Sequence, residues 1–220
     1  MEYIFSDYGL IAISLVISLG AQWFINHNYK KYSKQNDRGG VSGYEAARKI
    51  LDNNGLEHVG INKVEGTLSD FYDPSNKTVN LSNDIYNGQT IAAVSVAAHE
   101  CGHAIQHATS YSWLGLRSKL VPIVNFSNKW VTWVILAGMV LIESFPQLLW
   151  IGIGLYAITT LFSFITLPVE VNASQRAVIW LEQAGITDRE TTPMASEALH
   201  SAAYTYVVAA LSSLAYLLYL

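Results

Sequence analysis

Long apolar runs alternate with hydrophilic segments along the chain, and their lengths give the first information about its fold. Four runs stand out, at residues 8–25, 121–142, 148–169 and 202–220. Each comes close to the ~20 apolar residues that a helix needs to cross the hydrocarbon core of a bilayer. The second run has the least defined start, because it is interrupted at Asn125, Asn128 and Lys129. We therefore predict about four transmembrane helices.

The charges around these runs predict a retained membrane anchor and a topology. Glu2 and Asp7 precede the first run without any Lys or Arg, whereas a cleaved signal peptide begins with a basic segment. The thirteen Lys and Arg residues all lie in segments 26–129 and 170–202, beginning with Lys30, Lys31, Lys34 and Arg38 directly after the first run. Positive charges near span ends stay on the cytoplasmic side. We expect both segments to face the cytoplasm and both chain ends to face outward.

The hydrophilic segment after the first run has the pattern of a small α+β unit. Ser42 and Glu45 have the spacing of a capping box, in which each side chain satisfies the other residue's free backbone N–H. Gly55 is typical of a helix C-terminus, and Thr90 is placed to cap the start of a later helix. Together with alternating β-branched residues, these signals predict a helix at 43–54, strands at 59–64 and 78–81, a turn at 73–76 and a helix at 90–108.

Composition supports a membrane protein with a small soluble part. Hydrophobic residues make up 51% of the chain and charged residues 14%, against about 25% charged in soluble proteins. The net charge of −4 and the lack of a basic stripe argue against nucleic-acid binding, and the one cysteine, Cys101, excludes an internal disulfide. We predict a membrane anchor at 1–28, a cytoplasmic domain at 29–120, two transmembrane helices at 121–169, a cytoplasmic segment at 170–202 and a last transmembrane helix at 203–220.

The helix at 90–108 carries the motif H-E-x-x-H, at His99, Glu100 and His103. Residues four apart point to the same side of a helix, so the two histidines can hold one metal ion together. In this motif the neighbouring glutamate acts as a general base toward a water on the metal. The sequence therefore predicts a catalytic zinc site with His99 and His103 as ligands and Glu100 as the catalytic residue.

A catalytic zinc ion usually has three protein ligands, so a third is needed. His107 is unsuitable, because a residue on the same straight helix eight positions after His99 lies about 12 Å along the axis. The longer pattern H-E-x-x-H-x-x-G-x-x-H is excluded, since the chain has Gln106 and Thr109 at its last two fixed positions. Glu170 is the better candidate, because an acid at the end of a membrane span is costly unless it faces water, protein or a metal. We place it where the third span ends and a new helix begins.

Several stretches of the chain resemble the YugP-type neutral zinc metallopeptidases of bacteria: LSDFYDPSNKTVNLS, VAAHECGHAIQHA, SKLVPIVNFSN and TLPVEVNASQRA. More distantly, the layout is similar to that of the HtpX-type membrane gluzincins, in which a Glu in an E-x-x-A-D motif completes the zinc site. Glu170 and Ala173 match that motif, whereas Ser174 stands in place of its Asp. The resemblance implies a gluzincin-like catalytic domain with a small β-sheet, a Zn²⁺ cofactor and a place in the bacterial plasma membrane with the site facing the cytoplasm.

These features predict a zinc-dependent membrane-embedded endopeptidase that cleaves membrane-associated or cytoplasmic-face proteins and peptides. From the related gluzincins we expect an extended substrate to add alongside the strand at 78–81. Three residues are candidates for polarising the substrate carbonyl, and the sequence does not choose among them: Arg176, Tyr204 and Tyr206. Asp70, Tyr72 and Asp73 are candidates for shaping the cleft. The alternatives are a proteolytically inactive zinc-binding scaffold or assembly factor with membrane-protein partners, and a transport component. A purely structural zinc site needs no base such as Glu100.

Overall fold

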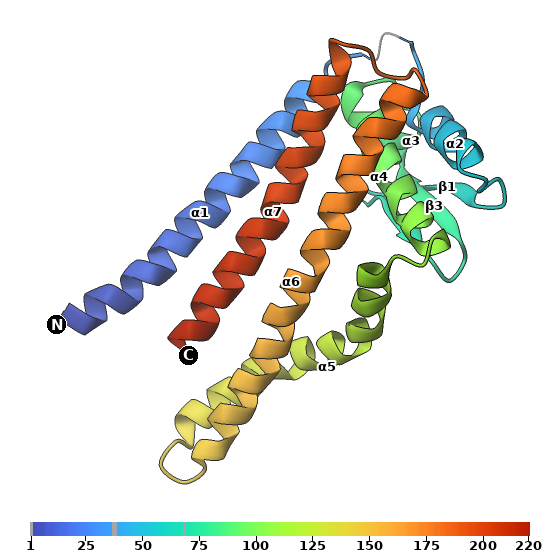
Figure 1. Ribbon diagram of the computed structural model, residues 1–220. Helices are drawn as coiled ribbons and strands as arrows, with labels where there is room; N and C mark the ends of the chain where they lie inside the picture. Colours follow the sequence, from blue (N-terminus) through green and yellow to red (C-terminus); the bar gives the residue numbers. More distant parts are fainter. Residues whose placement is uncertain (1, 37–38, 68) are drawn as a thin grey trace. The chain divides into compact units, whose positions relative to one another are not determined.

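The computed structural model describes residues 2–36, 39–67 and 69–220, so Arg38 lies outside the described residues. The chain is mostly helical with one small sheet (Figure 1). Its elements are α1 (Glu2–Tyr32), α2 (Gly43–Asn53), β1 (Gly60–Val64), β2 (Phe71–Asp73), β3 (Thr78–Ser82), α3 (Asn83–Tyr86), α4 (Ile91–Ala108), α5 (Ser112–Val140), α6 (Pro146–Gln183) and α7 (Thr191–Tyr219).

The chain divides into two compact units, which are described separately. Unit 1 comprises Met1–Ala21, Ser112–Pro168 and Thr205–Leu220. Unit 2 comprises Gln22–Tyr111 and Val169–Tyr204. Helices α1, α6 and α7 each contribute residues to both units.

The sheet of unit 2 has the strand order β1-β3-β2. β1 runs parallel to β3 with Gly60 opposite Thr78, and β2 runs antiparallel to β3 with Phe71 opposite Asn80. The two strands predicted from the sequence are confirmed as β1 and β3, but β2 was not foreseen. Because β3 is paired on both sides, the expectation that a substrate adds alongside residues 78–81 is wrong.

Local signals in the sequence set the ends of the two helices that pack beside the sheet. The capping box predicted at the start of α2 is present, since the Glu45 N–H donates to Ser42 Oγ and the Ser42 N–H donates to the Glu45 carboxylate. Thr90 caps α4 by accepting a hydrogen bond from the Ala93 N–H. Gly55 takes a left-handed conformation (φ +71°) after α2, which suits glycine.

Small residues on α4 allow close packing in the core of unit 2. Ala97, Ala98 and Cys101 are fully buried, and the Cys101 thiol donates to the Ala47 carbonyl on α2. Burial raises the pKa of the Cys101 thiol, which keeps it in the unreactive protonated form. Cys101 is thus a small core residue, as the sequence indicated.

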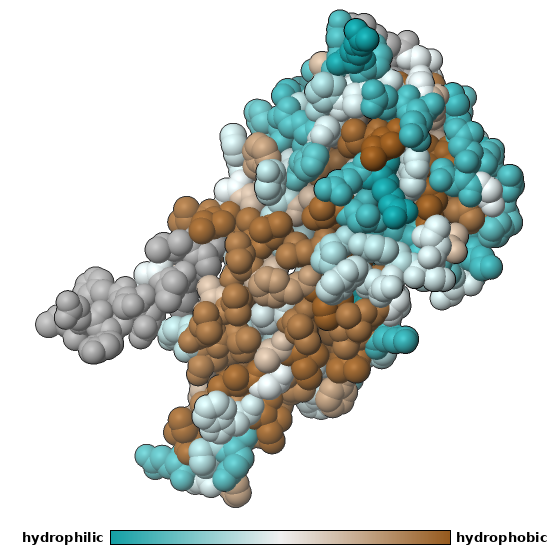
Figure 2. Space-filling model, viewed as in Figure 1, coloured by the Kyte–Doolittle hydropathy of each residue, from teal (hydrophilic) through white to brown (hydrophobic). Residues whose placement is uncertain are grey.

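Unit 1 contains long apolar helices with little of their surface buried. Among the described residues, three helices are long and apolar enough to cross a membrane: α5, α6 and α7. Hydrophobic residues cover most of the visible surface of unit 1 (Figure 2), and Trp133, Val140 and Trp150 are among those exposed. The run at residues 8–25 lies within the 31-residue helix α1, and a total of four spans stays a prediction.

Polar side chains within the helices of unit 1 bond to one another. Asn128, which interrupts the second apolar run, accepts a hydrogen bond from the Thr159 hydroxyl at 3.1 Å. The Thr160 and Ser213 hydroxyls lie 2.7 Å apart. Because an unpaired polar group in hydrocarbon costs several kcal/mol, such pairs make these residues compatible with a membrane span.

The expectation that a new helix begins after the third span is wrong, because α6 continues from Pro146 to Gln183. Pro168 lies inside this helix and lacks the N–H that would donate to the Phe164 carbonyl. Prolines are tolerated within membrane helices where neighbouring groups satisfy the freed backbone acceptor. The apolar run and Glu170 therefore belong to one helix.

Candidate metal centre

Helix α4 presents two imidazole rings on one side. His99 and His103 are one turn apart, and their ring centroids lie 4.8 Å from each other with the rings almost perpendicular, at 86°. His103 is 9% exposed, and His99 is somewhat more accessible. The four-residue spacing of the two histidines thus places two ligand nitrogen atoms side by side.

Helix α6 brings a carboxylate to the same point. Glu170 Oε2 lies 3.3 Å from His99 Nε2 and 3.6 Å from His103 Nε2. Glu170 is only 2% exposed. The ligand atoms of the three residues all lie within 4.8 Å of one another, so together they can hold a metal ion. Residues 71 positions apart in the sequence therefore meet as the sequence predicted.

The arrangement fits zinc. In a tetrahedral site with bonds of ~2.0–2.1 Å, neighbouring ligand atoms are about 3.3 Å apart. The two measured nitrogen–oxygen distances, 3.3 and 3.6 Å, are close to that value. Two imidazoles and one carboxylate are also a common ligand set of catalytic zinc, which leaves the fourth position to water or substrate.

The other ring nitrogen of each histidine has a neutral partner. Ser174 Oγ lies 3.2 Å from His99 Nδ1, and Gln106 Oε1 lies 3.1 Å from His103 Nδ1. The amide nitrogen of Gln106 donates to the Val169 carbonyl and to Asn172 Oδ1, at 2.9 and 3.0 Å. Gln106 can therefore only accept from His103, so in the neutral ring Nδ1 carries the proton and Nε2 keeps the lone pair that a metal ligand needs.

The electrostatic field of the site favours a cation. Burial alone would lower the pKa of His103, but the hydrogen bond to Glu170 and the charges of Glu100 and Glu170 outweigh it, and the pKa is raised. Since zinc ligands must be deprotonated histidines, protons compete with the metal for this site as the pH falls.

Glu100 follows His99 directly and is buried at 8% exposure. Its position on α4 is about 100° around the helix from His99, so the carboxylate stands beside the ligand pair. The role of Glu100 as the general base of the H-E-x-x-H motif stays a prediction.

The two helices that supply the ligands touch through their smallest residues. A Cβ atom placed on Gly102 would lie 3.1 Å from both Cα and Cβ of Ala173 and 3.2 Å from its carbonyl oxygen. Along the chain Gly102 lies between the two histidines, and Ala173 lies about one turn after Glu170. The absence of a side chain at residue 102 therefore allows α4 and α6 to approach closely beside the three proposed ligands.

Other residues singled out in the sequence have different partners. His107 Nδ1 lies 2.9 Å from the Tyr72 hydroxyl on β2, so it ties the sheet to α4. Asp70 accepts from the Ser82 N–H and hydroxyl, and Asp73 accepts from the turn that it begins. The roles of Arg176, Tyr204 and Tyr206 toward a substrate carbonyl stay predictions.

Sequence reasoning missed Gln106, and it left the role of Ser174 in doubt. Gln106 occurs three residues after His103 and so shares its helix face, a signal that was present in the motif. Ser174 stands where the wider group has Asp, and its hydroxyl occupies the position beside His99 Nδ1. Such partners orient metal ligands and fix their tautomers.

Comparison with known proteins agrees with this site. Residues 8–220 match the family described as "Putative neutral zinc metallopeptidase". The chain is 44% identical over 205 residues to "Putative membrane protease YugP" of Bacillus subtilis (strain 168), which covers 93% of this chain and 90% of the relative. No solved structure matches.

Replacing Gly102 by Ala tests the close approach of α4 and α6. We expect Gly102→Ala to lower zinc affinity at least about tenfold, because the ligand helices must separate by a few tenths of an ångström, and to destabilise the fold by ~1–3 kcal/mol through overpacking. Gly115→Ala is the matched control, since nothing lies within 4 Å of its added Cβ. Chelator competition and thermal unfolding measure the two effects, and equal zinc affinity in both variants would contradict this account.

Proposed function

Because the chain belongs to the family of neutral zinc metallopeptidases, we propose that it is a membrane-embedded zinc endopeptidase with His99, His103 and Glu170 as metal ligands. The observation that carries the proposal is the convergence of these three residues from α4 and α6 within 4.8 Å. The neighbouring carboxylate of Glu100 supplies the group that a hydrolase needs and a structural zinc site does not.

The protein's own residues have distinct parts in the proposed reaction. A zinc ion in this site acidifies water and polarises the carbonyl of a peptide bond. The Glu100 carboxylate takes up a proton from the attacking water and later releases it to the nitrogen of the departing amine. Ser174 and Gln106 hold the imidazoles of His99 and His103 with Nε2 toward Glu170, the orientation in which the three residues would hold the ion.

The sheet offers an edge for an extended substrate. β2 pairs with β3 on one side, so its other side is an edge within the described sheet. The Tyr72 side chain on β2 contacts His107 on α4, which carries the metal ligands. We propose that the substrate main chain pairs with β2, as edge strands commonly pair with peptides.

The proposed location is the plasma membrane, with the site on the cytoplasmic side. Three helices of the described chain qualify as membrane spans, and the relative from Bacillus subtilis is named a membrane protease. The Lys and Arg residues are confined to segments 26–129 and 170–202, which contain the proposed ligands. Proteins or peptides at the membrane surface are the substrates that such a position favours.

Removing the proposed base tests catalysis separately from metal binding. We expect Glu100→Gln to keep its zinc, because Glu100 is not a ligand, while peptide hydrolysis falls by ~10²–10⁴-fold. Glu182→Gln, an exposed position on α6, is the matched control. A casein digestion assay measures peptide hydrolysis, and metal analysis measures the bound zinc. Normal cleavage by Glu100→Gln would refute the general-base role, and an inactive wild-type protein that retains zinc would favour a scaffold.

Cysteine accessibility tests the topology, since the native Cys101 is buried. Single cysteines are introduced at three exposed positions: Ser144→Cys between α5 and α6, Ser75→Cys between β2 and β3, and Glu190→Cys between α6 and α7. An impermeant maleimide should label residue 144 in intact cells and residues 75 and 190 only after permeabilisation. Labelling of residues 75 and 190 from opposite sides would place the proposed ligands on opposite faces of the membrane.

A further inference from the structure

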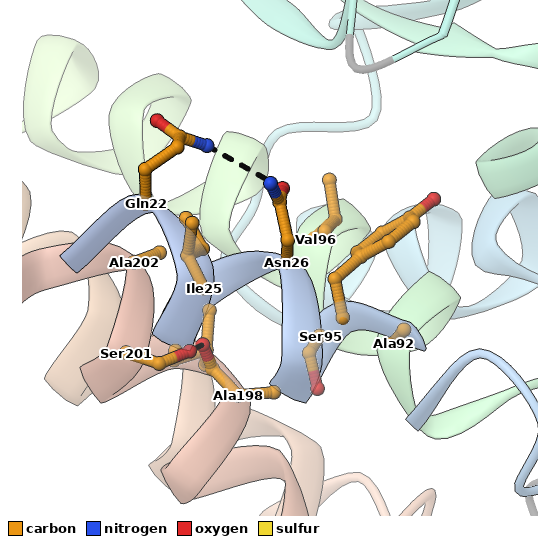
Figure 3. Close-up of a pocket in the computed structure, with 11 residues that line it drawn as sticks. Gln22, Ile25, Asn26, Ala92, Ser95, Val96, Ala198, Ser201 and Ala202 are labelled. Atoms are coloured by element: carbon orange, nitrogen blue, oxygen red, sulfur yellow. Dashed lines mark hydrogen bonds between the residues drawn. The ribbon is translucent and has the colours of Figure 1, made fainter. Parts of the chain in front are cut away.

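An apolar pocket of about 150 Å³ lies within unit 2, where the last turns of α1 meet the first turns of α4 and the first half of α7 (Figure 3). The residues that line it are all uncharged. Those that matter here are Ile25 from α1, Ala92, Ser95 and Val96 from α4, and Ala198 and Ala202 from α7.

The wall that α4 contributes continues the helix face that carries the metal ligands. Ser95 and Val96 precede His99 by four and three residues, and such positions share one side of a helix. Ser95 is one turn before His99, about 6 Å along the helix axis. A peptide advances ~3.3 Å per residue when extended. A substrate with its scissile bond at the metal centre therefore has a side chain one or two residues away that can reach this pocket.

The size of the pocket follows from the small side chains around it. Ala92, Ala198 and Ala202 leave the space open on the α4 and α7 walls. A cavity of about 150 Å³ has room for a benzene ring. The pocket therefore suits one side chain of the size of Leu or Phe.

We propose that this pocket is a specificity subsite that binds one bulky apolar side chain of the substrate. This inference rests on the proposed peptidase function. The lining segments of α1 and α7 lie at the ends of the predicted spans 8–25 and 202–220. A preference for apolar residues therefore fits substrates that reach the site from the membrane surface.

The first test measures side-chain preference in the full-length, zinc-loaded protein. Mass spectrometry of a casein digest locates the cleaved bonds, and two peptides are then made that differ only by Leu or Ala beside the scissile bond. Filling the pocket with Ala198→Leu should lower the ratio of kcat/KM for the Leu peptide over the Ala peptide at least about tenfold. The matched control is Ala209→Leu, an exposed position on α7 outside the pocket. An unchanged ratio in Ala198→Leu would overturn the subsite.

The second test measures binding without cleavage, in the Glu100→Gln background. The labelled Leu peptide should bind about tenfold more tightly than the Ala peptide, and adding Ala198→Leu should abolish this difference because the larger side chain fills the pocket. Equal binding of both peptides by Glu100→Gln alone would overturn the proposal.

The outcomes separate the subsite from the peptidase activity. Preferential binding of the Leu peptide by a wild-type protein that cleaves neither peptide would refute the proposed function and keep the subsite. Cleavage of both peptides without preference would refute the subsite and keep the function. A stoichiometric acyl lipid that is extracted from the wild-type protein and lost in Ala198→Leu would show a lipid site instead.

Discussion

The close approach of α4 and α6 at Gly102 and Ala173 is the constraint on which the candidate centre depends. Two histidines four residues apart lie on the same face of one helix because of the helix geometry alone. A third ligand must come from another helix, and its ligand atom must lie within a few ångströms of both imidazoles. A Cβ atom at residue 102 would lie only 3.1 Å from Ala173, so even a methyl group would require the helices to shift by a few tenths of an ångström. This packing places the Glu170 carboxylate 3.3 Å from His99 Nε2.

Hydrogen bonds fix the orientation of the ligands once the helices have met. Gln106 joins α4 to α6 through the Val169 carbonyl and Asn172, and in doing so its oxygen is committed to His103. Ser174 has the corresponding position beside His99. The same short stretch of α6 therefore provides the third ligand, the packing contact, the partner of His99 and the acceptors that hold Gln106 beside His103. This explains why so few residues of α6 are needed to complete the site.

The sequence alone predicted those features of the fold that depend on neighbouring residues. The capping box of Ser42 and Glu45 and the Thr90 cap foretold α2 and α4, and the spacing of His99 and His103 foretold their common face. It was insufficient where structure depends on distant partners. β2 is three residues long and is a strand only because it pairs with β3, and no local pattern shows that α6 continues through Pro168 or that Gly102 meets Ala173. The candidate ligands were thus predictable, whereas the contacts that orient them were not.

Metal analysis of the purified protein shows whether α4 and α6 share one zinc ion through Glu170. Wild-type protein should carry about one zinc ion per chain, and Glu170→Ala should lose most of it while its helical content is unchanged. Glu182→Ala, an exposed position farther along the same helix, should bind zinc as the wild-type protein does. Undiminished zinc in Glu170→Ala would remove this residue from the ligand set and contradict the account.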